Sequence, residues 1–516
     1  MTGDHAGDRT DPSTRALGGP WWAAPADESR RRTLPDPGAP MDGWVQVEVP
    51  GQWADQPQLE GALGEVLHRV EFDLPPTDET ERTWLVLDGV AGTADVWMDG
   101  DLLGDTDAPY LQHTFEITDV LALHDRRLVA LDVACPPAKT SSRRDLLGAL
   151  RADGGGPPGG VWRLVRTERT GPVRLGDLQV RCTSASHQRG ELWLRASLDT
   201  LLPRTVTVRT TVTGPDGATT DARAVPLAAG LNRQVWTVPV VDPPRWWPHS
   251  LGEPTTVEVG VEVELADDDP ERGDDPVSHR VVRRSGLRTL VREPAGWRIN
   301  GELLFLQGVS LRDAGDETDG LRDHLARLVG AGADLVRVVG RPPAPALWDA
   351  ADELGLLVWA DLPVVGHQHR STVPRAVRQA RRLVAATSHH PSVALWCCHD
   401  RRVLGRDLLV GDRALAGAVS TADPDVPVLL RAPAAAPTVQ GTRGRWPWSR
   451  PAPLLVAPPD AGWDADPDHL ARLVGAARSA AHDTAAGVVV PEPADDAGWD
   501  ALTKVFARRS GPARHA

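Results

Sequence analysis

The sequence predicts a multidomain protein in which two β-sandwiches precede a (β/α)8 barrel. Three observations predict this architecture. The chain has 516 residues, more than one hydrophobic core can hold. From about residue 44 to 290, short β-rich runs separated by turn residues form two successive blocks. From about residue 296, apolar strand-like runs alternate with helical ones. We therefore expect a flexible extension over residues 1–20 and domains over residues 21–172, 173–292 and 293–516.

The first block predicts an antiparallel sandwich. Its strand-like runs include WVQVEVP, TWLVLDGV and HTFEITD. Asp99 and Gly100 supply the Asp-Gly pair of a tight hairpin between the apolar runs ADVW and DLLG. The segment GGGPPGG at residues 154–160 must be an irregular loop, because neither a helix nor a ladder tolerates that composition.

The second block predicts another sandwich. It extends from about residue 173 to 290 and contains runs such as TVTVRTTVTG, RQVWTVPV and TTVEVGVEVEL. This length corresponds to a sandwich of roughly immunoglobulin size.

The remaining residues predict a parallel sheet wound with helices. Buried strands that alternate with helices are joined by right-handed crossovers into parallel sheets. Seven marked strands over about 220 residues favour a compact eight-stranded barrel with one poorly marked strand, and an open sheet is the alternative. The seven runs are FLQGVS, DLVRVV, LLVWADLP, VALWCCHD, VPVLLR, LLVAPP and GVVVPE.

The composition restricts which kinds of binding partner and which cellular compartment are expected. Lysine and arginine number 56 against 71 aspartate and glutamate, so the formal net charge of −15 argues against a nucleic-acid partner. The N-terminus lacks a signal segment and no stretch is long enough to span a bilayer, so we expect no membrane partner. Four cysteines without metal-ligand spacing fit a reduced, cytoplasmic protein: Cys135, Cys182, Cys397 and Cys398.

Local motifs in the two sandwiches carry a family resemblance. Residues 49–53 (VPGQW), 96–100 (VWMDG) and 157–163 (PPGGVWR) lie in the first block, and residues 244–252 (PRWWPHSLG) and 285–289 (SGLRT) lie in the second. The first set looks like the jelly-roll sugar-binding domain of glycoside hydrolase family two, which includes β-galactosidases, β-glucuronidases and β-mannosidases. The second set looks like the immunoglobulin-like domain of that family.

The third block continues the resemblance in the same order along the chain. The resemblance implies a (β/α)8 TIM barrel of the glycosidase type after the two sandwiches. Its motifs are residues 297–302 (WRINGE), 305–309 (FLQGV), 334–337 (DLVR), 352–361 (DELGLLVWAD) and 390–396 (HPSVALW).

The acid/base position departs from the family pattern. In the family, the strand that ends HPSVALW runs on into Asn-Glu, whereas this chain continues with Cys-Cys, His399 and Asp400. Asp400 keeps a carboxyl group there on a side chain shorter by about 1.5 Å, and its alternative role is to cap the next helix or pair with a neighbouring arginine. His399 donates a hydrogen bond where the family has Asn, or is a structural histidine.

The nucleophile position departs further. The resemblance places a Glu at the end of strand seven, where residues 454–462 (LLVAPPDAG) offer only Asp460. Glu492 follows a strand, but by order it belongs to strand eight. Retaining glycosidases need carboxyl groups about 5–5.5 Å apart and inverting ones about 6.5–9.5 Å, so a pair of Asp400 and Asp460 would correspond to the wider gap. The sequence thus indicates a degraded catalytic site.

Supporting residues match the family better. Arg337 resembles the arginine that orients the nucleophile, and Asp361 and Asp313 lie beyond strands three and one. The alternative for these charged side chains is to pair with one another in the barrel mouth. Trp359 and Trp396 are either barrel core or platforms for a sugar.

The resemblance implies a β-glycosidase of the β-mannosidase or β-galactosidase type, with impaired activity. The alternative is a pseudoenzyme that binds a carbohydrate or a protein without cleaving it. We expect a β-glycoside ligand, no cofactor and no metal, and a homo-oligomer is compatible with the sequence.

Overall fold

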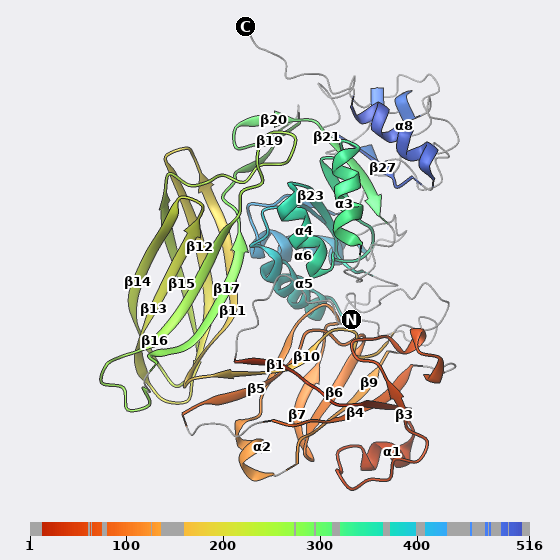
Figure 1. Cartoon of the computed structure of the whole chain (residues 1–516), viewed down its shortest axis with the longest axis vertical. Helices are drawn as coiled ribbons and strands as arrows, with labels where there is room; N and C mark the ends of the chain where they lie inside the picture. The colour runs from red at the N-terminus through yellow and green to blue at the C-terminus, as the bar shows by residue number, and fades with distance from the viewer. Residues whose placement is uncertain are drawn as a thin grey trace.

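The computed structural model describes residues 13–59, 62, 64–74, 80–124, 126–135, 159–272, 275–293, 296–311, 320–364, 372–398, 408–430, 455–456, 470–472, 474–475, 487–493 and 495–507. Figure 1 shows two β-rich lobes beside a mixed α/β part. Each of the three parts has its own hydrophobic cluster. A multidomain, β-rich protein is therefore confirmed, while the exact domain boundaries stay a prediction.

The N-terminal part consists of two antiparallel sheets packed face to face. Their strand orders are β1-β10-β5-β8 and β3-β2-β4-β9-β6-β7. Alternate side chains meet between the sheets, for example Leu85 from one sheet and Val96 from the other. The elements are β1 (Thr14–Ala16), β2 (Trp21–Pro25), α1 (Glu28–Thr33), β3 (Val45–Val47), two short 3₁₀ turns (Trp53–Asp55 and Pro57–Leu59), β4 (Glu65–Glu71), β5 (Arg82–Leu87), β6 (Thr93–Met98), β7 (Asp101–Thr106), β8 (His113–Glu116), α2 (Thr118–Leu123), β9 (Leu128–Ala134) and β10 (Val165–Thr170).

The prediction of a flexible extension over residues 1–20 is wrong for residues 14–16, which form a strand. Strand β1 pairs antiparallel with β10 and extends the smaller sheet at one edge. Its side chains are partly or fully exposed, so backbone hydrogen bonds hold it rather than buried apolar residues. A strand fixed in this way leaves no hydrophobic alternation in the sequence. Residues 1–12 lie outside the described part of the chain.

Two motifs of the first sandwich meet at one glycine. The backbone N–H of Trp53 donates to the carbonyl of Gly159 at 2.9 Å, and that of Gly51 donates to Val161 at 2.9 Å. A Cβ added at Gly159 would lie 1.8 Å from Cζ2 of Trp53, whose indole is buried. The VPGQW segment therefore packs directly on the glycine of the later segment.

We predict that Gly159→Ala destabilises the protein by about 2–3 kcal/mol, because the buried indole must leave its position to admit the methyl group. Thermal unfolding followed by calorimetry measures this loss. Gly330→Ala is the matched control, since a Cβ there has no neighbour within 4 Å among the described atoms. Equal midpoints for the two variants would contradict the prediction.

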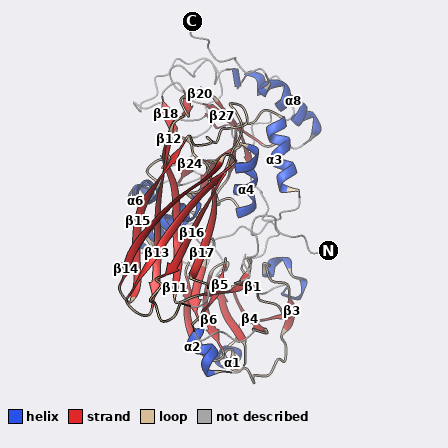
Figure 2. Cartoon of the chain, turned by 60° about the vertical axis from the view of Figure 1, so that its left-hand side comes forward, coloured by secondary structure: helices blue, strands red, loops and turns tan. Residues whose placement is uncertain are grey.

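The second part is a sandwich of long antiparallel strands, which Figure 2 shows in red beside the α/β part. One sheet has the order β11-β12-β15 and the other β14-β13-β16-β17. The inner positions of both sheets form one apolar cluster that includes Trp236. The strands are β11 (Val173–Ala185), β12 (Arg189–Thr200), β13 (Arg204–Gly214), β14 (Gly217–Leu227), β15 (Gly230–Val241), β16 (Val257–Leu265) and β17 (Val277–Ser285).

A buried arginine joins the two sandwiches. Arg82 on β5 donates to both carboxylate oxygens of Glu116, at 2.8 and 2.7 Å, and to Oδ1 of Asp199 on β12 at 2.7 Å. It also donates to the backbone carbonyl of Asp199 at 3.1 Å. The planar guanidinium can serve several acceptors at fixed angles, so this residue sets the orientation of one sandwich on the other.

The third part contains a seven-stranded parallel sheet with the order β25-β24-β23-β22-β21-β27-β26. The seven predicted strand-like runs correspond to these seven strands, so that prediction is confirmed. A three-stranded sheet, β18 (Leu290–Glu293), β19 (Gly296–Ile299) and β20 (Glu302–Leu304), precedes it. The elements are β21 (Leu306–Leu311), α3 (Leu321–Gly330), β22 (Leu335–Val338), α4 (Pro345–Leu354), β23 (Leu357–Asp361), α5 (Val373–Thr387), β24 (Val393–Cys397), α6 (Leu408–Ala422), β25 (Val428–Leu429), β26 (Leu455–Val456), β27 (Gly487–Pro491) and α8 (Asp496–Phe506).

Both faces of this parallel sheet are buried. One face packs on the helices, through residues such as Val336, Val338 and Val358. The other face forms a separate cluster with Leu335, Leu357 and Trp297. Strands covered on both faces are apolar at nearly every position, as the sequence showed. No helix within the described residues is long and apolar enough to cross a membrane.

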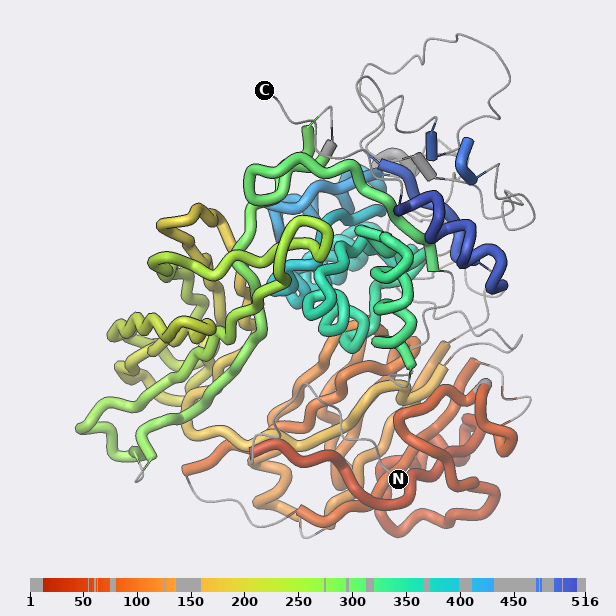
Figure 3. The backbone as a smooth tube through the Cα atoms, turned by 45° about the horizontal axis from the view of Figure 1, so that its top comes forward, coloured from red at the N-terminus to blue at the C-terminus, as the bar shows by residue number. Residues whose placement is uncertain are grey.

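The N-terminal sandwich also contacts the helices of the third part. Figure 3 shows the red and orange tube of the sandwich below the cyan helices. Arg382 on α5 donates to the backbone carbonyl of Gln112 at 3.0 Å. Tyr110 and Leu111, from the same sandwich loop, join the apolar cluster on the helix side of the sheet.

Candidate active site

Functional side chains of parallel α/β proteins gather where the strands end, and three strand ends of this sheet carry the predicted site residues. Arg337 lies near the end of β22, Asp361 is the last residue of β23, and β24 ends at Cys397. In the register of the sheet, Arg337 lies beside Trp359, and Asp361 lies beside Cys397. The sheet therefore brings these residues to one edge.

Arg337 and Asp361 form a buried ion pair. The Nη2 atom of Arg337 donates to Oδ2 of Asp361 at 2.7 Å, and Nε donates to Oδ1 at 3.4 Å. The exposed fraction of these side chains is 5% for the arginine and 0% for the aspartate. The backbone N–H of Gly340 donates to the same Oδ2 at 3.0 Å. Both charges are thus neutralised within the protein, which confirms the pairing that the sequence left open as one alternative.

The ring of Trp359 packs against the guanidinium of this ion pair. The Cζ atom of Arg337 lies 4.4 Å from the centre of the Trp359 ring, a cation–π distance. Trp359 is fully buried on the inner face of the sheet, in the cluster that contains Leu357 and Leu395. Its contact with Arg337 places it next to the candidate site as a support for the guanidinium.

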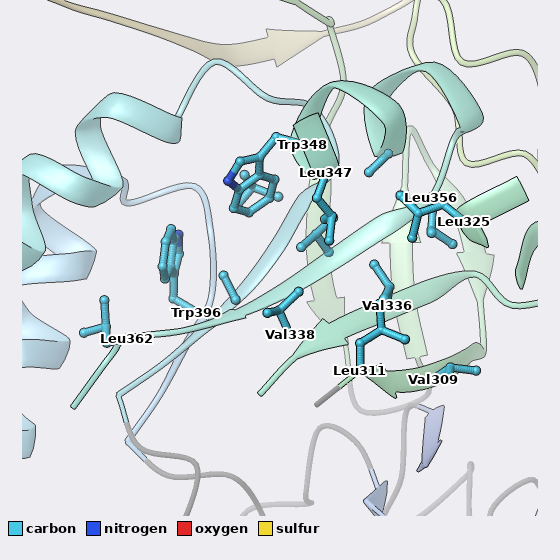
Figure 4. Close-up of a cluster of buried hydrophobic side chains, with 14 of the residues drawn as sticks. Val309, Leu311, Leu325, Val336, Val338, Leu347, Trp348, Leu356, Leu362 and Trp396 are labelled. Atoms are coloured by element: carbon cyan, nitrogen blue, oxygen red, sulfur yellow. The ribbon is translucent and has the colours of Figure 1, made fainter. Parts of the chain in front are cut away.

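Trp396 lies on the opposite face of the sheet. Its ring centre is 6.4 Å from that of Trp348 on α4, and both rings are buried among the helix-facing side chains. Figure 4 shows Trp396 and Trp348 together with Leu362 and Val338 in this cluster. Of the two alternatives for Trp396, this position corresponds to core packing, because the sheet separates it from Arg337 and Asp361.

Glu492 is directed away from the ion pair. Its Oε1 lies 3.0 Å from Nε2 of His324 on α3, and the imidazole of His324 packs edge-on against Trp499 of α8. The backbone N–H of Glu492 donates to the carbonyl of Ser310 at 3.3 Å. The side chain therefore contacts the outer helices, so its position does not suit a nucleophile beside Arg337.

Four predicted site residues lie outside the described part of the chain, at positions that follow strands β21, β24 and β26. Their predicted roles as acid/base, nucleophile and binding residues stay predictions. These residues are Asp313, His399, Asp400 and Asp460.

A network around α4 fixes the entry to β24, and the sequence did not reveal it. The Oδ2 atom of Asp352 forms a hydrogen bond of 2.7 Å with Nδ1 of His390, and Oδ1 accepts the backbone N–H of Ser392 at 3.0 Å. The indole N–H of Trp246 donates to the backbone carbonyl of Asp352 at 2.9 Å. The motifs HPSVALW, DELGLLVWAD and PRWWPHSLG all contribute, yet nothing in their spacing shows that they meet.

Cys398, the residue after β24, is an inert thiol. Its sulfur lies among the helix-facing apolar side chains, and burial raises its pKa to about 12. It is therefore protonated at neutral pH and does not supply a thiolate nucleophile. Within the ranges that the structure describes, no three His, Cys, Asp or Glu side chains gather in a way that could hold a metal ion.

Comparison with known proteins adds independent similarities. Residues 64–157 match the family model "Glycosyl hydrolase 2 galactose-binding domain-like". The chain is 24% identical over 372 residues to beta-mannosidase B of Aspergillus clavatus, and 22% identical over 379 residues to beta-mannosidase B of Emericella nidulans. Each alignment covers 64% of this chain and 43% of the fungal protein, so the chain spans less than half of these relatives' length.

Solved structures share the fold at low identity. A putative beta-galactosidase from Bacteroides fragilis superposes with a TM-score of 0.67 at 22% identity, covering 80% of this chain and 63% of that one. Beta-D-mannosidase from Dictyoglomus thermophilum gives a TM-score of 0.66 at 17% identity, covering 82% and 58%. These structures show that the described chain shares a multidomain, β-rich fold with them.

Proposed function

We propose that the chain is a member of glycoside hydrolase family two, and that it binds β-glycosides of the mannoside or galactoside type and hydrolyses them slowly. The observation that carries the proposal is the buried pair of Arg337 and Asp361 at the strand ends. Its position, near the C-terminal ends of two neighbouring parallel strands, is where enzymes with this architecture hold their substrates. Curated relatives named beta-mannosidase B support the choice of sugar class.

The proposal includes the finer architecture. The last strand, β27, pairs with the first, β21, and each other described strand lies beside its neighbours in sequence. This strand order supports the proposal of a (β/α)8 barrel. We assign the first sandwich as the jelly-roll domain and the second as the immunoglobulin-like domain, which is supported by the matched family model and the paired sheets.

The ion pair between Arg337 and Asp361 supports the proposal that hydrolysis is slow. In the resemblance this guanidinium orients the nucleophile, but here Asp361 accepts two of its five N–H groups, and the exposed fraction is 5% for the arginine side chain and 0% for the aspartate. A carboxylate nucleophile would have to share the guanidinium with Asp361. We therefore place the acid/base role on Asp400 and the weaker nucleophile role on Asp460, and infer that the pair is inefficient.

The proposal is tested with nitrophenyl β-D-mannoside, β-D-galactoside and β-D-glucuronide. We expect turnover of the mannoside or galactoside at least about 100-fold slower than that of an active family-two enzyme assayed beside it. Asp400→Ala should lower this turnover by a further factor of about 100, because a general acid typically contributes that much. Asp267→Ala is the control, since that carboxylate lies in the second sandwich and is exposed. Equal turnover in both variants would remove Asp400 from the mechanism.

Carbohydrate binding without hydrolysis is the second candidate function. It is favoured by the same neutralised Arg337, which needs no nucleophile to be stable. A rise in melting temperature with a β-mannoside or β-galactoside, together with no release of nitrophenol, would select this function over the first.

The proposal extends to setting and partners. We place the protein in the cytoplasm, which is supported by four free cysteines, and expect no nucleic-acid or membrane partner, which fits the net charge of −15. A homo-oligomer is compatible with the sequence.

A further inference from the structure

The second sandwich and the parallel sheet meet at the end of helix α6. The side-chain amide of Gln179 on β11 donates to the backbone carbonyl of Ala422 at 2.8 Å. Two residues along the same strand, Nη1 of Arg181 donates to Oδ2 of Asp425 at 2.9 Å and lies 3.9 Å from Oδ1 of Asp423. One guanidinium from the sandwich therefore faces two carboxylates from the other part.

A second arginine reinforces this contact. Arg288, which follows β17, donates to the backbone carbonyls of Pro391 and Val393 at the start of β24. Its charge also interacts with Asp423 and Asp425. The charged or titratable groups that face Asp423 are thus Arg181, Arg288 and Asp425, and the thiol of Cys182 lies near Arg288.

Asp423 is the poorly compensated member of this group. Its side chain is 5% exposed, whereas that of Asp425 is 46% exposed and takes the closer contact with Arg181. It follows the last residue of α6, where the helix dipole disfavours a negative charge. Its Oδ1 accepts the backbone N–H of Asp425 at 3.2 Å. A buried carboxylate in this position is costly when ionised.

We propose that this contact is a pH-dependent joint between the second sandwich and the parallel sheet. With the Asp423 carboxyl neutral, Arg181 pairs with Asp425 alone and the two parts dock tightly. With Asp423 ionised, two carboxylates compete for Arg181, and the buried charge draws water into the contact. Because Arg288 belongs to the same contact, the loosened state also releases the backbone segment that leads into β24.

The direction and window of the effect follow from burial. Burial raises the pKa of Asp423 to about 6, from a usual value near 3.8. The folded protein therefore holds this proton more tightly than the unfolded chain does. The stabilising contribution is complete below about pH 4 and is lost as the pH rises through 6. A shift of about two pH units corresponds to about a 100-fold change in the unfolding equilibrium constant.

The test compares wild type with Asp423→Asn in thermal and urea unfolding between pH 4.5 and 8. Asparagine mimics the neutral carboxyl, so we expect the ratio of the two unfolding constants to change by about 30-fold over this range, with the variant more stable at pH 8. Asp267→Asn is the control, because that carboxylate is 98% exposed and does not face Asp423, so the pH dependence of wild type should stay in place. Parallel pH curves for wild type and Asp423→Asn would overturn the proposal.

A measurement on the wild-type chain keeps the proposal testable if the variant does not fold. Hydrogen exchange, corrected for its intrinsic pH dependence, should be faster at pH 8 than at pH 5 in peptides that cover β11 and the end of α6. Peptides that cover β13, which lies in the other sheet of the sandwich, should show no such difference. Unchanged protection in β11 would contradict the joint whatever the glycosidase assays show.

Discussion

Replacement of Arg337 by methionine should lower the free energy of unfolding by about 3–5 kcal/mol. The substitution leaves the Asp361 carboxylate buried without the cation that neutralises it, and an uncompensated buried charge costs far more than the pair contributes. Urea unfolding followed by tryptophan fluorescence at pH 7.5 measures this loss.

A double variant separates the charge from the packing. Arg337→Met combined with Asp361→Leu removes both charges and should recover most of the loss, because apolar residues often replace a buried pair at little cost. Arg327→Met is the control for loss of an arginine. Its partner Asp496 is 98% exposed, so we expect a change within about 0.5 kcal/mol. A loss below 1 kcal/mol for Arg337→Met would show that water reaches Asp361.

The sequence was informative about the parallel sheet because its strands are buried on both faces. Runs such as LLVWAD and VALWCC are apolar at nearly every position and are separated by helical patterns, so their existence and order could be predicted. Because of the same property, the sequence does not show which side chains point to which face of the sheet. In β24, Leu395 points to the inner core and Trp396 to the helices, but a strand that is apolar on both sides shows no alternation from which to assign them.

The positions of the site residues along the strands could be predicted from the sequence. The groups with which their side chains interact could not. Arg337 and Asp361 were identified from the family resemblance together with their positions near strand ends, where parallel sheets place polar side chains. Whether each charge faces a ligand or the other depends on the register between β22 and β23. That register is set by packing across the sheet and leaves no trace in local spacing.

Contacts between the three parts were beyond the reach of the sequence. Arg288 reaches carbonyls more than 100 residues away, and Arg82 reaches Asp199 across the two sandwiches. Each arginine lies in an ordinary strand-like run, and nothing in the neighbouring sequence indicates that its side chain is buried. Only the docking of whole sheets brings these side chains to their acceptors, so a local pattern cannot indicate them.

Positioning of the candidate site depends on this same docking. The strand that ends at Cys397 begins beside the HPS turn, and that turn is held from the sandwich by Arg288 and from α4 by Asp352. The two supports use different chemistry. Arg288 is partly buried and binds neutral carbonyls, whereas the carboxylate of Asp352 is fully buried between a histidine ring and a backbone amide. The second support should therefore have the larger effect on stability.

Replacement of Asp352 by alanine is expected to cost at least about 3 kcal/mol, because it leaves the Nδ1 atom of His390 and the amide of Ser392 buried without their acceptor. Asp352→Asn should cost less, since the amide oxygen can still accept one of the two hydrogen bonds. Urea unfolding followed by tryptophan fluorescence is the appropriate measurement, because Trp246 and Trp348 both lie at this network.

The neighbouring Glu353 provides the control that decides the cause. Its carboxylate is 39% exposed and pairs with Arg284 and Arg322, so Glu353→Ala should change the free energy of unfolding by less than about 1 kcal/mol. Both substitutions remove an acidic side chain from the same turn of α4 and alter helix propensity alike. A large loss in both would point to the helix itself, and a large loss in Asp352→Ala alone identifies the buried hydrogen bonds that fix the start of β24.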